Sequence, residues 1–156
     1  MTFHLRRSQA LLAALAFAVL AACTHPADNA TPEGAVRAWL DHMEESMGDP
    51  GEAAEAYALL GPRARKNLAA RAARASQVEG RRAQAFEMLA EGHFGLRFRP
   101  KTLHATVTGS EAVVDVTGDD PGTESARVAC VRDSEGWRVE PELPEMAAPV
   151  RVKDGG

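Results

Sequence analysis

The spacing of apolar residues changes once along this chain, near Gly92, and this change limits the folds that the chain can adopt. Before it, apolar residues recur every three or four positions, as on one face of a helix; after it, they alternate with polar residues, as in a half-buried strand. Helices followed by an antiparallel meander form an α+β domain. We therefore expect N-terminal helices packed on one face of a curved antiparallel sheet of about four strands.

The helical half begins at Thr31, a suitable N-cap, with Pro32 at the first helical position. An apolar stripe follows at helical spacing and consists of Val36, Trp39, Leu40, Met43 and Met47. The turn-forming run 48–51 ends this helix, and Gly61-Pro62 breaks the chain again. Further helices are expected over residues 52–60, 62–76 and 78–90.

The segment 62–76 is expected to be an amphipathic helix with a basic face. At 100° per residue, one side carries Arg63, Lys66, Arg71 and Arg74, and the other carries Ala64, Leu68, Ala72 and Ala75. Because arginine binds phosphate through paired hydrogen bonds, an anionic lipid or an acidic envelope protein is one class of partner for this face. A solvated face, balanced by the acidic first helix nearby in sequence, explains the same pattern more simply.

Alternation in the second half predicts four strands, over residues 102–108, 112–116, 125–132 and 137–140. Gly109-Ser110 suits a two-residue hairpin loop. Thr108 should then pair with Glu111, which places His104 opposite Asp115.

His104 and Asp115 are the first catalytic candidates, because a carboxylate beside an imidazole orients it and begins an acid/base dyad. The same register turns Leu103, Ala105 and Val107 towards the core, so that His104 and Asp115 point to solvent as a surface pair, which is the simpler interpretation.

His93 is a third candidate, at the junction of helix and strand, where it would line the mouth of a cavity or only cap a loop. His42 and Glu45 lie three apart on the first helix but lack the further ligands that a metal needs. We expect no metal site and no cofactor.

The N-terminus carries a secretion pattern. Arg6 and Arg7 precede the uncharged run 10–23, which is too short for a comfortable membrane span of about 20 residues. The end of the run, Leu20-Ala21-Ala22-Cys23, resembles the lipobox of bacterial lipoproteins. The resemblance implies cleavage between Ala22 and Cys23 and acylation of Cys23, for example with palmitate. An ordinary secretory signal or an uncleaved anchor would give a similar pattern.

The lipoprotein resemblance implies a place in the bacterial cell envelope. The chain would be held by its N-terminal lipid, on the periplasmic side of the outer membrane if the host is Gram-negative, since Thr24 rather than Asp follows Cys23. Loss of residues 1–22 would change the formal net charge from −4 to −6. Export excludes nucleic acid as the partner, and acylation of Cys23 leaves Cys130, a predicted buried thiol, without a disulfide partner.

The mature part resembles the nuclear transport factor 2-like (SnoaL-like, cystatin-like) superfamily. Residues 31–40 look like its opening helix, and Gly136-Trp137-Arg138-Val139 looks like its closing strand. The resemblance implies a cone-shaped α+β domain. Four parts of the chain are then expected: a signal peptide over 1–22, a tether over 23–30, the domain over 31–143 and an irregular tail over 144–156.

Two functions fit this outline. The favoured one is a lipid-anchored, noncatalytic binding or assembly module of the envelope. The other is a small hydrolase, dehydratase or isomerase that uses a histidine/carboxylate pair inside the cone.

Overall fold

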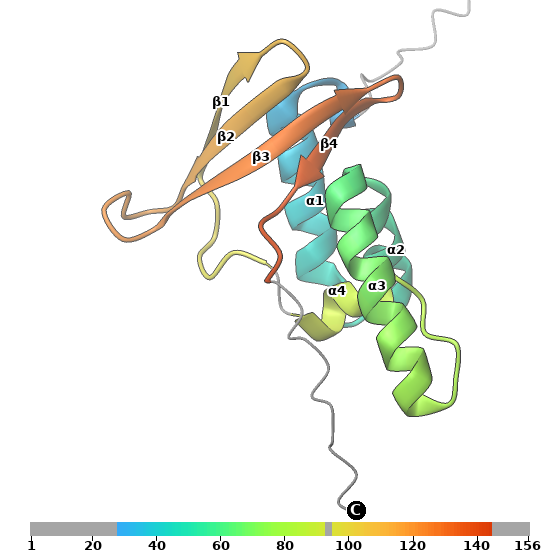
Figure 1. Ribbon diagram of the computed structural model, residues 1–156. Coiled ribbons are helices and arrows are strands. Elements are labelled where there is room, and N and C mark those ends of the chain that lie inside the picture. Colours follow the sequence, from blue (N-terminus) through green and yellow to red (C-terminus); the bar gives the residue numbers. More distant parts are fainter. Residues whose placement is uncertain (1–27, 93–94, 145–156) are drawn as a thin grey trace, which may run out of the picture.

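The computed structural model describes residues 28–92 and 95–144 (Figure 1). The predictions for the signal peptide, for Cys23, for His93 and for the tail after Pro144 lie outside the described residues. Within them the fold is α+β, as expected, with helices preceding one antiparallel sheet of strand order β1-β2-β3-β4. The sheet is open, with β1 and β4 at its edges.

The helical half has a short 3-10 helix and four α-helices: η1 (Asp28–Ala30), α1 (Pro32–Glu45), α2 (Pro50–Ala58), α3 (Pro62–Glu79) and α4 (Glu87–Gly92). The predicted N-cap of α1 is confirmed, because the Thr31 side chain accepts a hydrogen bond from the Gly34 N–H at 3.0 Å. Proline occupies the start of α1, α2 and α3, where a missing N–H costs nothing.

Several helix boundaries differ from the prediction. The second helix begins at Pro50 rather than 52, because Asp49 within the predicted terminator is itself an N-cap and accepts from the Gly51 N–H at 2.7 Å. The predicted helix over 78–90 is wrong: α3 continues to Glu79 and ends at Gly80, whose φ of +69° is left-handed. Only the short α4 follows before the sheet.

The sheet follows the predicted strands closely. Its members are β1 (Thr102–Thr108), β2 (Glu111–Thr117), β3 (Ser125–Asp133) and β4 (Gly136–Glu140). Thr108 pairs with Glu111 across the Gly109-Ser110 loop, and His104 lies opposite Asp115, as the two-residue loop requires. One face of the sheet therefore presents its apolar side chains to the helices.

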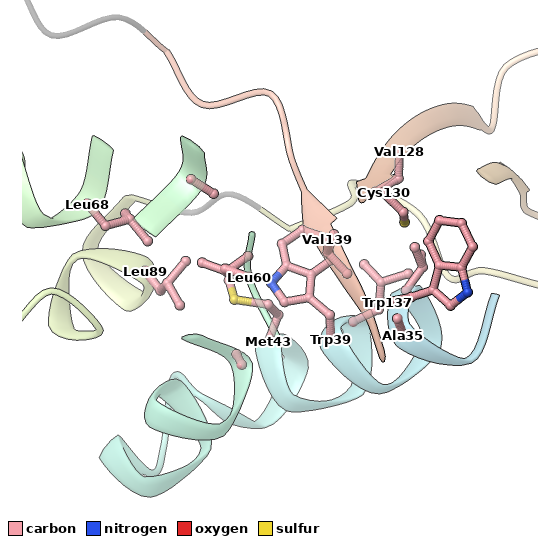
Figure 2. Close-up of a cluster of buried hydrophobic side chains, with 14 of the residues drawn as sticks. Ala35, Trp39, Met43, Leu60, Leu68, Leu89, Val128, Cys130, Trp137 and Val139 are labelled. Carbon is pink, nitrogen blue, oxygen red and sulfur yellow. The ribbon is translucent and has the colours of Figure 1, made fainter. Parts of the chain in front are cut away.

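The core lies between α1 and this face of the sheet (Figure 2). Trp39 and Met43 of α1 lie beside Leu60 and Val139, and Trp137 of β4 lies near Ala35 and Cys130 (Figure 2). Leu68 and Leu89 extend the cluster towards α3 and α4 (Figure 2). Met47 was predicted to continue the stripe, but it is 76% exposed, because α1 ends at Glu45 and the chain turns there.

Cys130 is the small buried thiol that its strand position predicted. It is 1% exposed. Burial, together with the negative charges of Glu33 and Glu140, raises the pKa of the thiol to about 12. A thiol of this kind stays protonated and unreactive at physiological pH.

The β4 edge is closed by the link between α2 and α3. Leu60 forms a parallel bridge with Val139; the Val139 N–H donates to the Leu59 carbonyl and the Gly61 N–H donates to the Val139 carbonyl, each at 2.8 Å. The Glu140 carboxylate then accepts from the N–H groups of Arg63 and Ala64, each at 2.9 Å. A glutamate from the last strand thus caps α3, which lacks a cap of its own.

The last residues of the predicted tether over 23–30 contact the domain. Residues 28–30 form η1, and the Asn29 side-chain amide donates to the Glu135 carbonyl in the β3–β4 turn at 3.1 Å. Gly136 permits this contact, since a Cβ there would lie 2.7 Å from Asn29. Residues 28–30 are therefore held against the β3–β4 turn.

Candidate functional site

A cavity of about 600 Å³ lies between the end of α1, α4 and the segment 95–100 that leads into β1. Its apolar walls come from Leu40 and Met43 of α1, from Leu89 of α4 and from the half-buried Leu96 and Phe98. Ligand sites usually have volumes of roughly 300–1,000 Å³ and predominantly apolar walls. By size and lining, this cavity is the leading candidate site.

The apolar wall is the continuation of the core stripe of α1. Leu40 and Met43 are three residues apart and therefore share the inner face of the helix. Met47 lies one turn further on, beyond the helix end, and reaches the lip of the cavity with its side chain in solvent. An exposed methionine at such a lip offers a flexible apolar contact.

The rim of the cavity carries charges of both signs. Asp41 and Glu44 of α1 face Arg97 and Arg99 of the segment 95–100. Glu44 and Arg99 form an ion pair at 3.2 Å, but both side chains are exposed, so this pair adds little stability. Arg97 makes no ion pair within the described part of the chain, which leaves one cation at the mouth for a ligand.

The described lining has no acid/base pair suited to catalysis. Its polar interior group is Ser46, whose hydroxyl donates to the Met43 carbonyl at 2.8 Å. A serine nucleophile needs a base within hydrogen-bond reach. What the arrangement offers chemically is binding of an apolar group with a charged end.

His104 and Asp115 lie outside this cavity. Both are exposed, on the face of the sheet that points away from the core. Asp115 forms its ion pair with Arg127 of β3, with Oδ1 3.3 Å from Nε, rather than with His104. The two residues therefore have the surface placement that the register predicts.

A histidine/carboxylate contact that the sequence did not indicate joins α1 to α2. The Nδ1 atom of His42 lies 2.5 Å from Oε2 of Glu52, and both side chains are about two-thirds buried. Helical spacing alone pairs His42 with Glu45 instead. The signal for its true partner was Asp49-Pro50, which starts α2 early enough to put Glu52 in its first turn. Neither side chain lines the 600 Å³ cavity.

The basic face of α3 is partly used inside the domain. Arg63 lies beside the Glu140 carboxylate, with Nε 3.6 Å from Oε2. Arg71 donates to the Asn67 side chain and to the Pro144 carbonyl. These contacts connect the basic face to β4 and to the segment after it. Lys66 and Arg74 are exposed.

Within residues 28–92 and 95–144, no three His, Cys, Asp or Glu side chains gather as a metal site would require. In the same part of the chain, no helix has the length and apolarity to cross a bilayer.

Comparisons with family models, with curated proteins and with solved structures found no match for this chain.

Proposed function

We propose that the chain is a lipid-anchored protein of the bacterial envelope whose domain binds an amphiphilic ligand without catalysis. Acylation of Cys23 would hold it at the membrane, on the periplasmic side of the outer membrane in a Gram-negative host. The order of helices before an antiparallel meander supports a nuclear transport factor 2-like architecture. The basic face of α3, which carries Arg63, Lys66, Arg71 and Arg74, stays a candidate contact for an anionic lipid or an envelope protein.

The cavity beside α1 carries the binding proposal. Each methylene that a ligand buries there contributes about 0.8 kcal/mol, so an alkyl chain would bind between Leu40, Met43 and Phe98. Arg97 is placed to receive a carboxylate or phosphate at the mouth. A long-chain fatty acid is the simplest molecule with both features.

Binding is tested with a fluorescent long-chain fatty acid added to the mature protein. Met47→Asp removes an apolar contact and places a negative charge at the lip, where it repels the fatty-acid carboxylate, and is expected to weaken binding roughly tenfold, the effect of losing about 1.4 kcal/mol. Val78→Asp is the matched control, because Val78 is 83% exposed but lies outside the cavity. Equal affinities for the two variants would place the ligand elsewhere and refute the proposed site.

The contribution of the charged rim to ligand affinity is tested with Arg97→Ala. This variant is expected to bind the fatty acid less tightly while binding the corresponding uncharged alcohol as well as before. Arg82→Ala, which removes another exposed arginine, should change neither affinity. Loss of alcohol binding in Arg97→Ala would mean that the arginine shapes the cavity instead of holding an anion.

The anchor is tested by growing cells with radioactive palmitate. The chain should incorporate label, and Cys23→Ala should abolish the label and leave the precursor uncleaved. Label that persists on the variant would exclude Cys23 as the attachment site.

A further inference from the structure

The two edge strands of the sheet differ in whether their outer backbone groups are hydrogen-bonded. The β4 edge is bonded to Leu59–Gly61. Within residues 28–92 and 95–144 the β1 edge has no neighbouring strand, and Figure 1 shows β1 at the margin of the domain with no labelled helix or strand beyond it. An edge strand exposes a row of backbone donors and acceptors that pairs readily with another strand.

One hydrogen bond of Ala105 shows which backbone groups of β1 point away from β2. The Ala105 N–H donates to Oε1 of Glu33 on α1 at 2.9 Å, so it points away from β2. Alternate residues of an antiparallel strand direct both backbone groups to the same side. Leu103 and Val107 therefore also present N–H and C=O groups outward, and in the described structure no backbone bond reaches them.

The side chains of β1 do little to discourage pairing. Natural edges are usually protected by lysine, proline, a bulge or a short length. The seven residues of β1 include no lysine, no proline and no acid. Val107 is also 52% exposed, on the face that its neighbours use for the core.

The sequence of β1, Thr-Leu-His-Ala-Thr-Val-Thr, is nearly symmetric in residue type about Ala105: turned end to end, threonine meets threonine, leucine meets valine and His104 meets Thr106. Antiparallel pairing of two copies about this residue puts Thr102 opposite Thr108 and Leu103 opposite Val107 of the second chain. Pairs of this kind stabilise neighbouring strands, and the exposed Val107 would be covered. We propose that β1 is a dimerisation edge, through which two copies of this chain form one continuous sheet.

Glu33 sets the strength of this association. In the single chain its carboxylate occupies the position that the Ala105 carbonyl of the second copy would take. Each copy must release this hydrogen bond before the strands can meet. The dimer is therefore expected to be weak in solution and to form more readily where copies are concentrated on one membrane.

The test uses disulfide crosslinking of the full-length chain in cells that express two differently tagged copies. Thr102→Cys in one copy and Thr108→Cys in the other would face each other with Cα atoms about 4.5 Å apart, within disulfide range. Either variant expressed with itself places the cysteines roughly 20 Å apart, from about 3.4 Å per residue. The wild-type chain supplies the background from Cys23 and Cys130.

The mixed pair should crosslink under mild oxidation while each variant alone stays at the wild-type background. Val107→Lys, an exposed and structurally tolerant change, should lower the crosslinked fraction at least fivefold by placing a charge on the edge. Glu33→Ala should raise it roughly tenfold at low expression, by removing the competing acceptor. Crosslinks that are equal in mixed and single variants, or that ignore Val107→Lys, would overturn the proposal. Crosslinks to other proteins alone would do the same.

Discussion

Glu140 caps the N-terminus of α3, and its removal should reverse the effect on stability of a substitution at the neighbouring Gly61. The carboxylate is 5% exposed, accepts two backbone N–H bonds at 2.9 Å and lies at the positive end of an 18-residue helix. A hydrogen bond to a charged group contributes roughly 1.5–3 kcal/mol to stability, and loss of an N-cap costs about 0.5–2 kcal/mol. Glu140→Ala is expected to lower the free energy of unfolding by about 2–4 kcal/mol.

The effect of a substitution at Gly61 should depend on whether the Glu140 side chain is present. It is the N-cap position of α3, with φ −81° and ψ 173°, an extended backbone that serine also adopts. A Cβ at Gly61 would lie 2.4 Å from Oε1 of Glu140, so Gly61→Ser must displace the carboxylate. In the Glu140→Ala background the clashing atoms are gone, and the serine hydroxyl can cap the helix. Gly61→Ser should destabilise the wild type but stabilise Glu140→Ala by about 1 kcal/mol.

The assay is urea unfolding of the four proteins of this double-mutant cycle, followed by circular dichroism. Glu142→Ala, an exposed glutamate two residues away, is the control for loss of charge and should change the free energy by less than about 0.5 kcal/mol. If Gly61→Ser has the same sign in both backgrounds, the carboxylate is not the cap of α3.

Four further outcomes follow from single contacts. The Cys130 thiol, with its pKa raised to about 12, should resist maleimide at pH 8 in the folded protein and react once urea unfolds it. The hydrogen bond from Arg138 lowers the pKa of Asp133. The stability that this shift provides is present above the ordinary carboxyl pKa of about 3.9 and is lost as the pH falls through the pKa of Asp133 in the folded protein. Asp133→Asn should therefore flatten the acid side of a curve of stability against pH. Exchange of Asp115 for Asn should change stability by less than about 0.5 kcal/mol, because its ion pair with Arg127 is exposed. Gly80→Ala meets no atom within 4 Å but forces alanine to φ +69°, and thermal unfolding should show a cost of about 1 kcal/mol.

The parts of the fold that could be predicted are those fixed by neighbours in sequence. The two-residue loop at Gly109-Ser110 determined the register of β1 and β2, and Thr31-Pro32 determined the start of α1. The Glu140 cap could not be predicted, because it joins residues 77 apart and depends on how β4 meets the α2–α3 link. The candidate cavity was missed because the irregular segment 95–100 forms one wall. No periodic pattern marks such a segment.

The closing strand shows why only one edge of the sheet is open. Trp137 and Val139 face the core, while Arg138 and Glu140 alternate with them and are also buried. Buried charges are costly unless they are paired. Arg138 donates to the Ala58 carbonyl at the end of α2 and pairs with Asp133, while Glu140 caps α3. These contacts hold the α2–α3 link against β4, whereas β1 has only the Glu33 carboxylate to satisfy one of its donors.

The position of the cavity relative to the N-terminus gives a last prediction about the proposed anchor. Asn29 is held at the β3–β4 turn, near the start of α1, whereas the cavity lies at the other end of that helix. A helix of 14 residues separates the two by about 20 Å, at 1.5 Å per residue. The ligand site should therefore open away from the anchored end, and the membrane should contribute nothing to it. The fatty-acid affinity should be measured for the detergent-solubilised acylated protein and for an unacylated secreted form. The two affinities should agree within about twofold, because changes at distant sites act independently to about this precision. A weaker affinity of the acylated form would mean that the lipid of Cys23 itself reaches the site and competes with the added fatty acid.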